Sequence, residues 1–323
     1  VAGLRFLDQA DRAHDHAGRA EPALEAVMRD EGGLHRMQLV AARDAFDGDA
    51  DAACNPGGLG SPDTNYKLGV PTSPSIDLDA FDKVGKISFG DIDLQEDDQT
   101  LWLVNLNQQA LISVDVSGAT GSLPGTVKQY PLSTISGLPT CTQGTFRPWA
   151  LKFNDGLGYL GGVCSEENSG SGTATADLKA YVLSFDPANP AGGLTTEISQ
   201  RLDNYTRAVP WHPWISTWPG TFDSGSGSRY TEPVVSDIEF AENGDLRIAL
   251  MDRGGHQGGH VNYKAIADST TTFSWRSGGE YWHACRVAGS YVLEGDGASA
   301  CPSHSFGSPR GPSGEGYYYD FRA

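Results

Sequence analysis

Short apolar runs separated by polar turns recur along the middle of the chain. Residues 90–115 (GDIDLQEDDQTLWLVNLNQQALISVD) contain three such runs, and the turns between them are rich in Asp, Asn and Gln. Runs of four or five β-prone residues between such turns are typical of antiparallel strands and not of helices. This stretch therefore predicts a meander of three strands.

The same frame of strand, tight turn and strand occurs twice more. It is found at residues 147–163 and 235–250, where the turns contain Asp-Gly and Asn-Gly. These dipeptides favour tight hairpins because Gly adopts positive φ without steric cost. A third strand follows each hairpin, at 178–186 and at 279–285. The meander is therefore a repeat.

The beginning of the sequence matches only part of this repeat. Residues 4–8 (LRFLD) resemble residues 246–250 (LRIAL), and residues 32–40 (GGLHRMQLV) fit the outer strand. Residues 1–43 thus predict a partial repeat whose first strand is missing. Between these strands, Leu24, Val27 and Met28 have helical spacing, which predicts a short helix within residues 21–30.

Irregular repeats of about 45 residues, each a strand meander, predict an all-β, β-propeller-like domain with long loop insertions. Three and a half blades do not close a ring, since about four are needed, so the ring is expected to be incomplete in this chain. A β-sandwich with long loops is the alternative, but it does not predict the recurrence. The expected organisation of the single domain 1–323 is a partial blade at 1–43, an insertion at 44–83, blades at about 84–133, 145–203 and 233–295, and a C-terminal segment at 296–323.

Composition agrees with a turn-rich β protein and narrows its partners. The 323 residues include 41 Gly and 18 Pro. No apolar run approaches the ~20 residues that a membrane-spanning helix needs. The net charge of −18 disfavours nucleic acid and anionic membranes as partners and is compatible with cation binding.

Five cysteines indicate the compartment. Cys141 and Cys164 bracket the hairpin of one repeat, and Cys285 and Cys301 bracket a short loop. We predict two disulfides and an oxidising, extracellular compartment; buried free thiols are the alternative. Cys54 is left without a partner in this scheme.

Acidic residues at the starts of two repeats are candidate metal ligands. Alternation places Asp91 and Asp93 on one side of their strand, and Asp237 and Glu239 on one side of the equivalent strand. In a propeller such residues lie beside the central channel and would bind Ca²⁺ there. Alternatively, they hold the blades together by accepting hydrogen bonds from turn N–H groups. The sequence contains no G-x-S-x-G, HExxH, P-loop or dinucleotide motif, and no residue is predicted to be catalytic.

Two further groups have both a functional and a structural interpretation. Trp211, Trp214 and Trp218 lie in WHPWISTWP, where they either bind a glycan or partner protein or cover a blade edge. The sequence DRAHDH at 11–16 offers imidazole and carboxylate ligands for a metal, or is a solvated loop. The Asp- and Gly-rich residues 44–63 lack the spacing of an EF-hand.

Several of these motifs, taken in order, resemble a known group of proteins. They are FGDIDLQEDDQTLWLVNL, RPWALKFNDGLGYLGGVCSEE, SDIEFAENGDLRIALMDRGGHQ, YVLEGDG and GPSGEGYYYDF. From about residue 84 onward the chain resembles the propeller-like N-terminal region of large bacterial cell-surface proteins that carry SdrD/Cna-B-like repeats. The resemblance implies secretion, display on a bacterial cell surface and no established catalytic residues.

These observations together predict a non-enzymatic extracellular module with a structural or adhesive role. Its expected partner is a cell-surface protein, a glycan or further copies of itself. The alternative function is that of a calcium-dependent β-propeller hydrolase or lyase.

Overall fold

A computed structural model describes most of the chain from residue 80 to residue 294. The described residues are 80–118, 124–205, 209–220, 230–275 and 277–294, with Pro74, Leu78, Cys301 and the backbone of strands β1, β2, β3, β12 and β13.

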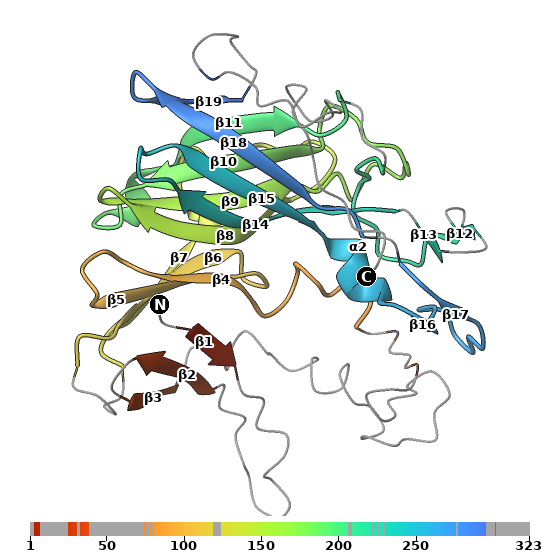
Figure 1. The fold of residues 1–323 in the computed structure, drawn as a ribbon, viewed down its shortest axis with the longest axis horizontal. Coiled ribbons are helices and arrows are strands. Elements are labelled where there is room, and N and C mark those ends of the chain that lie inside the picture. Colours follow the sequence, from red (N-terminus) through yellow and green to blue (C-terminus); the bar gives the residue numbers. More distant parts are fainter. Residues whose placement is uncertain are drawn as a thin grey trace, which may run out of the picture.

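Three antiparallel sheets of four strands make up the main body (Figure 1). In each of them, neighbouring strands follow one another along the chain. Sheet A consists of β4 (Phe89–Leu94), β5 (Thr100–Asn105), β6 (Ala110–Asp115) and β7 (Val127–Pro131). Sheet B consists of β8 (Phe146–Asn154), β9 (Leu157–Cys164), β10 (Lys179–Phe185) and β11 (Thr195–Arg201). Sheet C consists of β14 (Pro233–Phe240), β15 (Leu246–Asp252), β18 (Glu280–Val287) and β19 (Ser290–Leu293).

The remaining elements are short. An N-terminal sheet has the order β1-β2-β3, and two hairpins lie in the connections. A single helical turn, α2, follows β15 directly. Their bounds are β1 (Gly3–Phe6), β2 (Glu25–Asp30), β3 (Gly33–Gln38), β12 (Asp223–Ser224), β13 (Gly227–Ser228), α2 (Arg253–Gly258), β16 (Asn262–Tyr263), β17 (Thr272–Phe273), and the 3₁₀ turns Leu132–Thr134 and Pro190–Gly192.

The first strands of the three large sheets lie next to one another. Cα atoms of β8 come within 8 Å of Cα atoms of both β4 and β14, and some Cα atoms of β14 come within 8 Å of β4. Each first strand has an irregularity in its pairing with the second strand, after Phe89, Pro148 and Val235 respectively. An inserted residue of this kind bends the strand and redirects its side chains. The three sheets therefore share a construction as well as an order.

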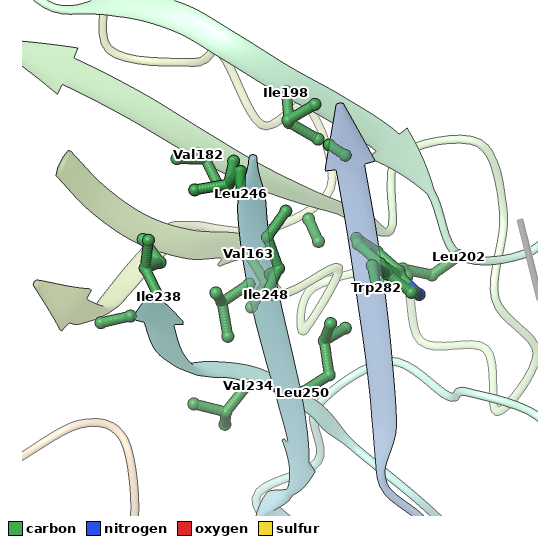
Figure 2. Close-up of a cluster of buried hydrophobic side chains, with 14 of the residues drawn as sticks. Val163, Val182, Ile198, Leu202, Val234, Ile238, Leu246, Ile248, Leu250 and Trp282 are labelled. Atoms are coloured by element: carbon green, nitrogen blue, oxygen red, sulfur yellow. The ribbon is translucent and has the colours of Figure 1, made fainter. Parts of the chain in front are cut away.

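Two apolar cores join the sheets face to face. One, between sheets A and B, includes Trp102, Leu111, Phe153 and Leu183. The other, between sheets B and C, includes Val182 and Ile198 of sheet B and the residues of sheet C that Figure 2 shows facing them. Because each Å² of apolar surface removed from water contributes about 25 cal/mol of favourable free energy, these faces are the main source of stability. Sheet B is covered on both sides and is the centre of the described fold.

The predicted all-β class and antiparallel meanders are confirmed, and the three large sheets lie within the ranges 84–133, 145–203 and 233–295. The predicted helix at 21–30 is wrong, since Glu25–Asp30 is strand β2. This strand pairs with both β1 and β3, and a short apolar run has no periodicity that separates the two states. The fourth strands β7, β11 and β19 were not anticipated as parts of the repeat. Among the described residues no sheet closes on itself, and no helix is long and apolar enough to cross a membrane.

Candidate functional site

The predicted acidic residues lie on the first strands of sheets A and C, at equivalent positions. Asp91 lies within the irregularity of β4, between Phe89 and Ile92, and its Oδ1 accepts a hydrogen bond from the N–H of Ile92 at 2.8 Å. Asp237 follows the irregularity of β14, and its Oδ1 accepts from the N–H of Ile238 at 2.8 Å. The repeat seen in the sequence is thus repeated in atomic detail.

In sheet A both carboxylates reach the neighbouring sheet. Asp91 Oδ2 accepts the N–H of Leu151 at 3.0 Å, and Asp93 Oδ2 accepts the N–H of Phe153 at 2.8 Å. Strand β8 is the edge strand of sheet B, so every second N–H group points away from its own sheet and needs an acceptor. The two carboxylates of β4 supply it, and they bind sheet A to sheet B.

Lys152 lies between acids of two different sheets. Its ammonium lies 3.1 Å from Glu239 Oε1 and 3.9 Å from Asp93 Oδ1. Burial alone lowers the pKa of Lys152, but the hydrogen bond with Glu239 and the nearby carboxylate of Asp93 outweigh it and raise this pKa. The lysine therefore remains charged and connects the first strands of all three sheets.

Burial and neighbouring negative charges disfavour the ionised form of these acids, whereas the charged form of Lys152 is favoured. Burial raises the pKa of Asp91 to about 6 against hydrogen bonds from Leu151 and Ile92 that lower it, and the carboxylates of Asp237 and Asp93 add to the increase. Burial also raises the pKa of Asp93 and of Asp237. The four predicted residues and Lys152 thus form one electrostatic cluster, which we call the inner-strand cluster: Asp91, Asp93, Lys152, Asp237 and Glu239.

This donor set fits calcium poorly. Ca²⁺ takes six to eight oxygen ligands, whereas one oxygen of Asp91 and one of Asp93 already accept main-chain N–H groups of sheet B. Lys152 also supplies, next to Glu239 and Asp93, the positive charge that a cation would bring. Of the two roles that the sequence allowed for these acids, the geometry favours the structural one, in which they hold the sheets together by accepting N–H groups.

The tryptophans proposed as a binding surface are packed in the protein. Trp211 and Trp214 are 2% and 1% exposed. Their indole N–H groups donate to Glu280 Oε2 at 2.9 Å and to the carbonyl of Pro233 at 2.8 Å. Trp218 is half-buried and contacts the rings of Phe273 and Trp275. Trp211 and Trp214 have no face available for stacking on a glycan, which favours the structural interpretation of this group over the binding one.

A buried ionic network next to these tryptophans was missed at the sequence level. The guanidinium of Arg253 is completely buried; it bonds to Glu232 at 2.7 Å and to Asp82. It also lies 4.4 Å from the ring centroid of Trp214. A single Arg in a Gly-rich sequence gives no signal of this role.

The network continues to sheet B through further charges. Arg147 donates two hydrogen bonds to Glu167, and Lys86 lies 2.7 Å from the other oxygen of Glu167. Burial opposes ionisation, yet these two cations lower the pKa of Glu167 to about 2. Lys86 also pairs with Asp82 at 2.8 Å. Because removing one partner from a buried pair costs about 3–5 kcal/mol, this network holds the segment before β4 against sheets B and C.

Both predicted disulfides are confirmed. Cys141 bonds to Cys164, and Cys285 bonds to Cys301. His283 lies near the second pair, but bonded cysteines offer no thiolate to a metal. Two disulfides are typical of proteins from oxidising compartments. Cys54, the DRAHDH sequence and residues 44–63 lie outside the described residues.

Fold and site together define a disulfide-bonded, mostly β protein built from repeated antiparallel sheets. No family model matches the chain, and no solved structure matches it. Two proteins of Dictyostelium discoideum are similar to it: Colossin-A is 26% identical over 265 residues and Colossin-D is 24% identical over 247 residues. The alignments cover 78% and 74% of this chain but only 2% and 23% of the relatives. The chain therefore spans a small part of each relative, and the comparisons lend no support to a bacterial origin.

Proposed function

We propose that this chain is a non-enzymatic structural module of an extracellular protein, with its sheets arranged as blades of a propeller-like ring. The observation that carries the proposal is the use of the inner-strand cluster. Its carboxylates accept N–H groups of the neighbouring sheet, and its lysine joins the sheets by ion pairs. Groups that would bind a metal or act on a substrate are engaged in holding the fold together.

Three further findings support the same function. The disulfides suit an oxidising environment outside the cell. The relatives are far longer than this chain, which fits a module within a larger assembly. Trp211 and Trp214 contribute to the core, so an adhesive surface for a protein or glycan would lie on loops, where binding residues concentrate on rigid scaffolds.

The alternative is a calcium-dependent hydrolase. It is favoured by one observation: the second carboxylate oxygen of Asp237 has no partner among the described residues, and this acid lies close enough to Asp91 to raise its pKa.

Thermal unfolding in excess Ca²⁺ and in excess chelator separates the two functions. A structural module is expected to show the same Tm in both conditions and no turnover of ester or lactone substrates. The double variant Asp91→Ala/Asp93→Ala should lower Tm, because each lost acceptor leaves a buried N–H group unsatisfied at about 1–3 kcal/mol. A rise in Tm with Ca²⁺, together with hydrolysis that the chelator abolishes, would refute the structural proposal.

A further inference from the structure

Sheet C carries a group of metal-binding side chains on the face that points away from sheet B. Trp282 and Ala284 of β18 belong to the core shared with sheet B. Side chains alternate along a strand, so His283 and Cys285 lie together on the opposite face. The ligand atoms of His283, Cys285 and Cys301 all lie within 4.8 Å of one another. One of the two disulfides thus has a histidine directly beside it.

The imidazole of His283 is held by carboxylates on both sides of its ring. Its Nδ1 lies 3.0 Å from Glu294 Oε2, and its Nε2 lies 3.0 Å from Asp245 Oδ2. The same Nε2 lies 3.9 Å from Cys285 Sγ. A histidine that binds a metal commonly donates its other ring N–H to a carboxylate, which fixes the orientation of the ring. Glu294 is placed to accept from Nδ1, and Nε2 then faces Asp245 and the disulfide.

The groups around the disulfide are also fixed by hydrogen bonds. Asp245 Oδ1 accepts the N–H of Arg286 at 3.0 Å, and Asp245 Oδ2 accepts from Asn243 Nδ2 at 2.9 Å. Cys301 is completely buried, and its Sγ accepts the N–H of Cys285 at 3.2 Å. Two sulfur atoms and one imidazole nitrogen form a ligand set that Zn²⁺ takes in tetrahedral sites with one position left for solvent.

We propose that reduction of the Cys285–Cys301 disulfide creates a zinc site formed by these two cysteines and His283, with solvent as the fourth ligand. A dithiol reductant transfers two electrons to the disulfide and is itself oxidised to a disulfide, which leaves two thiols. When Zn²⁺ binds, both thiols lose their protons to solvent and coordinate as thiolates. His283 coordinates through Nε2, and any proton on this nitrogen also passes to solvent. The negative charge of Asp245 beside Nε2 favours the cation.

The site keeps the same connection closed in both redox states. In the oxidised chain the disulfide ties Cys301 to β18, and in the reduced chain the metal ion does so. Thiolate and imidazole ligands select Zn²⁺ over Ca²⁺, which takes oxygen ligands. The other disulfide offers a comparison within the molecule, because among the described residues Cys141 and Cys164 belong to no such group. The inference goes beyond the structural function, since it uses neither the ring nor the inner-strand cluster.

Protection of cysteines by zinc in the full chain tests the site. In a Cys54→Ser background, both disulfides are reduced with a phosphine, which does not compete for the metal as a thiol would. The thiols are then alkylated with iodoacetamide in ZnCl₂ or in chelator, and the products are read by peptide mass spectrometry. We expect Zn²⁺ to prevent the alkylation of Cys285 and Cys301. Alkylation of Cys141 and Cys164 should be the same in both conditions.

Variants separate a built site from unspecific binding to thiols. His283→Gln should abolish the protection and the visible absorption bands that tetrahedral Co²⁺ gives in the reduced protein. Glu294→Gln changes a positioning residue, so it should keep these bands and weaken Zn²⁺ binding about 10–100-fold. His260→Gln, at an exposed position outside the group, is the matched control and should leave both measurements unchanged.

Three results would overturn the site: equal alkylation in ZnCl₂ and in chelator, equal protection of both cysteine pairs, or full protection in His283→Gln. If the reduced chain unfolds, Zn²⁺ should restore its near-UV circular dichroism, and His283→Gln should prevent this recovery. A reduced chain that stays unfolded in Zn²⁺ would also overturn the proposal. None of these results depends on Ca²⁺ or on turnover, so failure of the zinc site and failure of the structural function are distinguishable.

Discussion

At the scale of single residues, one carboxylate position serves in two ways. Asp91 and Asp237 each accept the N–H of the following residue, which fixes the carboxylate beside the irregularity of its strand. The remaining oxygen of Asp91 accepts from another sheet, at the cost of being buried. The equivalent oxygen of Asp237 has no hydrogen-bond partner among the described residues, and Asp237 as a residue is exposed. Among the described residues, the carboxylate at this position therefore joins two sheets at Asp91 but not at Asp237.

The raised pKa of Asp91 makes stability depend on pH. Its pKa is about 6 in the folded protein against 3.8 when solvated, so the folded state binds the proton more strongly. The free energy of unfolding contributed by this group is therefore highest below pH 3.8 and falls as the pH rises to about 6. We expect Asp91→Asn to remove this fall, so that Tm of the wild type decreases relative to the variant between pH 4 and pH 7.

The exposed Asp98 provides the control, since Asn also tolerates its positive φ of 55°. Asp98→Asn removes one carboxylate from an exposed position and so controls for the change in net charge. If Asp91→Asn and Asp98→Asn give parallel profiles, Asp91 does not carry a raised pKa in the folded state.

Local sequence patterns predicted the roles of some of these residues and not those of others. The disulfides were predictable because each cysteine pair brackets a hairpin or loop close in sequence. The burial of Trp211 was not, because a tryptophan beside prolines suits a surface as well as a core, and its partner Glu280 is 69 residues away. Arg253 contacts Val84 across 169 residues. Contacts at such separations leave no pattern in one sequence.

At the scale of elements, turn chemistry and alternation predicted the first three strands of each sheet. Outer strands such as β7 (VKQYP) were missed because three of its five residues are exposed, which leaves little hydrophobic signal. The irregularities on the first strands were also missed, since they follow from packing between sheets.

Gly161 illustrates this packing on β9. A Cβ atom at this position would lie 2.6 Å from Val235 and 2.8 Å from Ala150, so sheets B and C approach closely there. We expect Gly161→Ala to lower the free energy of unfolding by about 1–3 kcal/mol through overpacking, measured by urea denaturation. Gly220→Ala is the control because nothing lies within 4 Å of its added Cβ, and it should be nearly neutral. Equal effects of the two substitutions would show that the sheets do not meet at Gly161.

At the scale of the whole molecule, sheet B makes the described fold a single cooperative unit. Val182 and Leu183 are neighbours on β10, yet Val182 belongs to the core shared with sheet C and Leu183 to the core shared with sheet A. Trp149 packs against both cores. The three sheets cannot separate without exposing one of these faces.

The three sheets should therefore unfold together in one transition, whether a substitution weakens the core between sheets A and B or the core between sheets B and C. Leu183→Ala is expected to cost about 2–5 kcal/mol through the cavity that it leaves, and Val182→Ala should also destabilise. Because both cores are lost together, each variant should shift the urea midpoint of one transition without changing its slope, with tryptophan fluorescence and far-UV circular dichroism coinciding. Leu157→Ala, at an exposed position of the same sheet, should change the midpoint little. A biphasic curve for Leu183→Ala, with sheet A unfolding first, would show that the sheets are independent modules and that sheet B does not couple them.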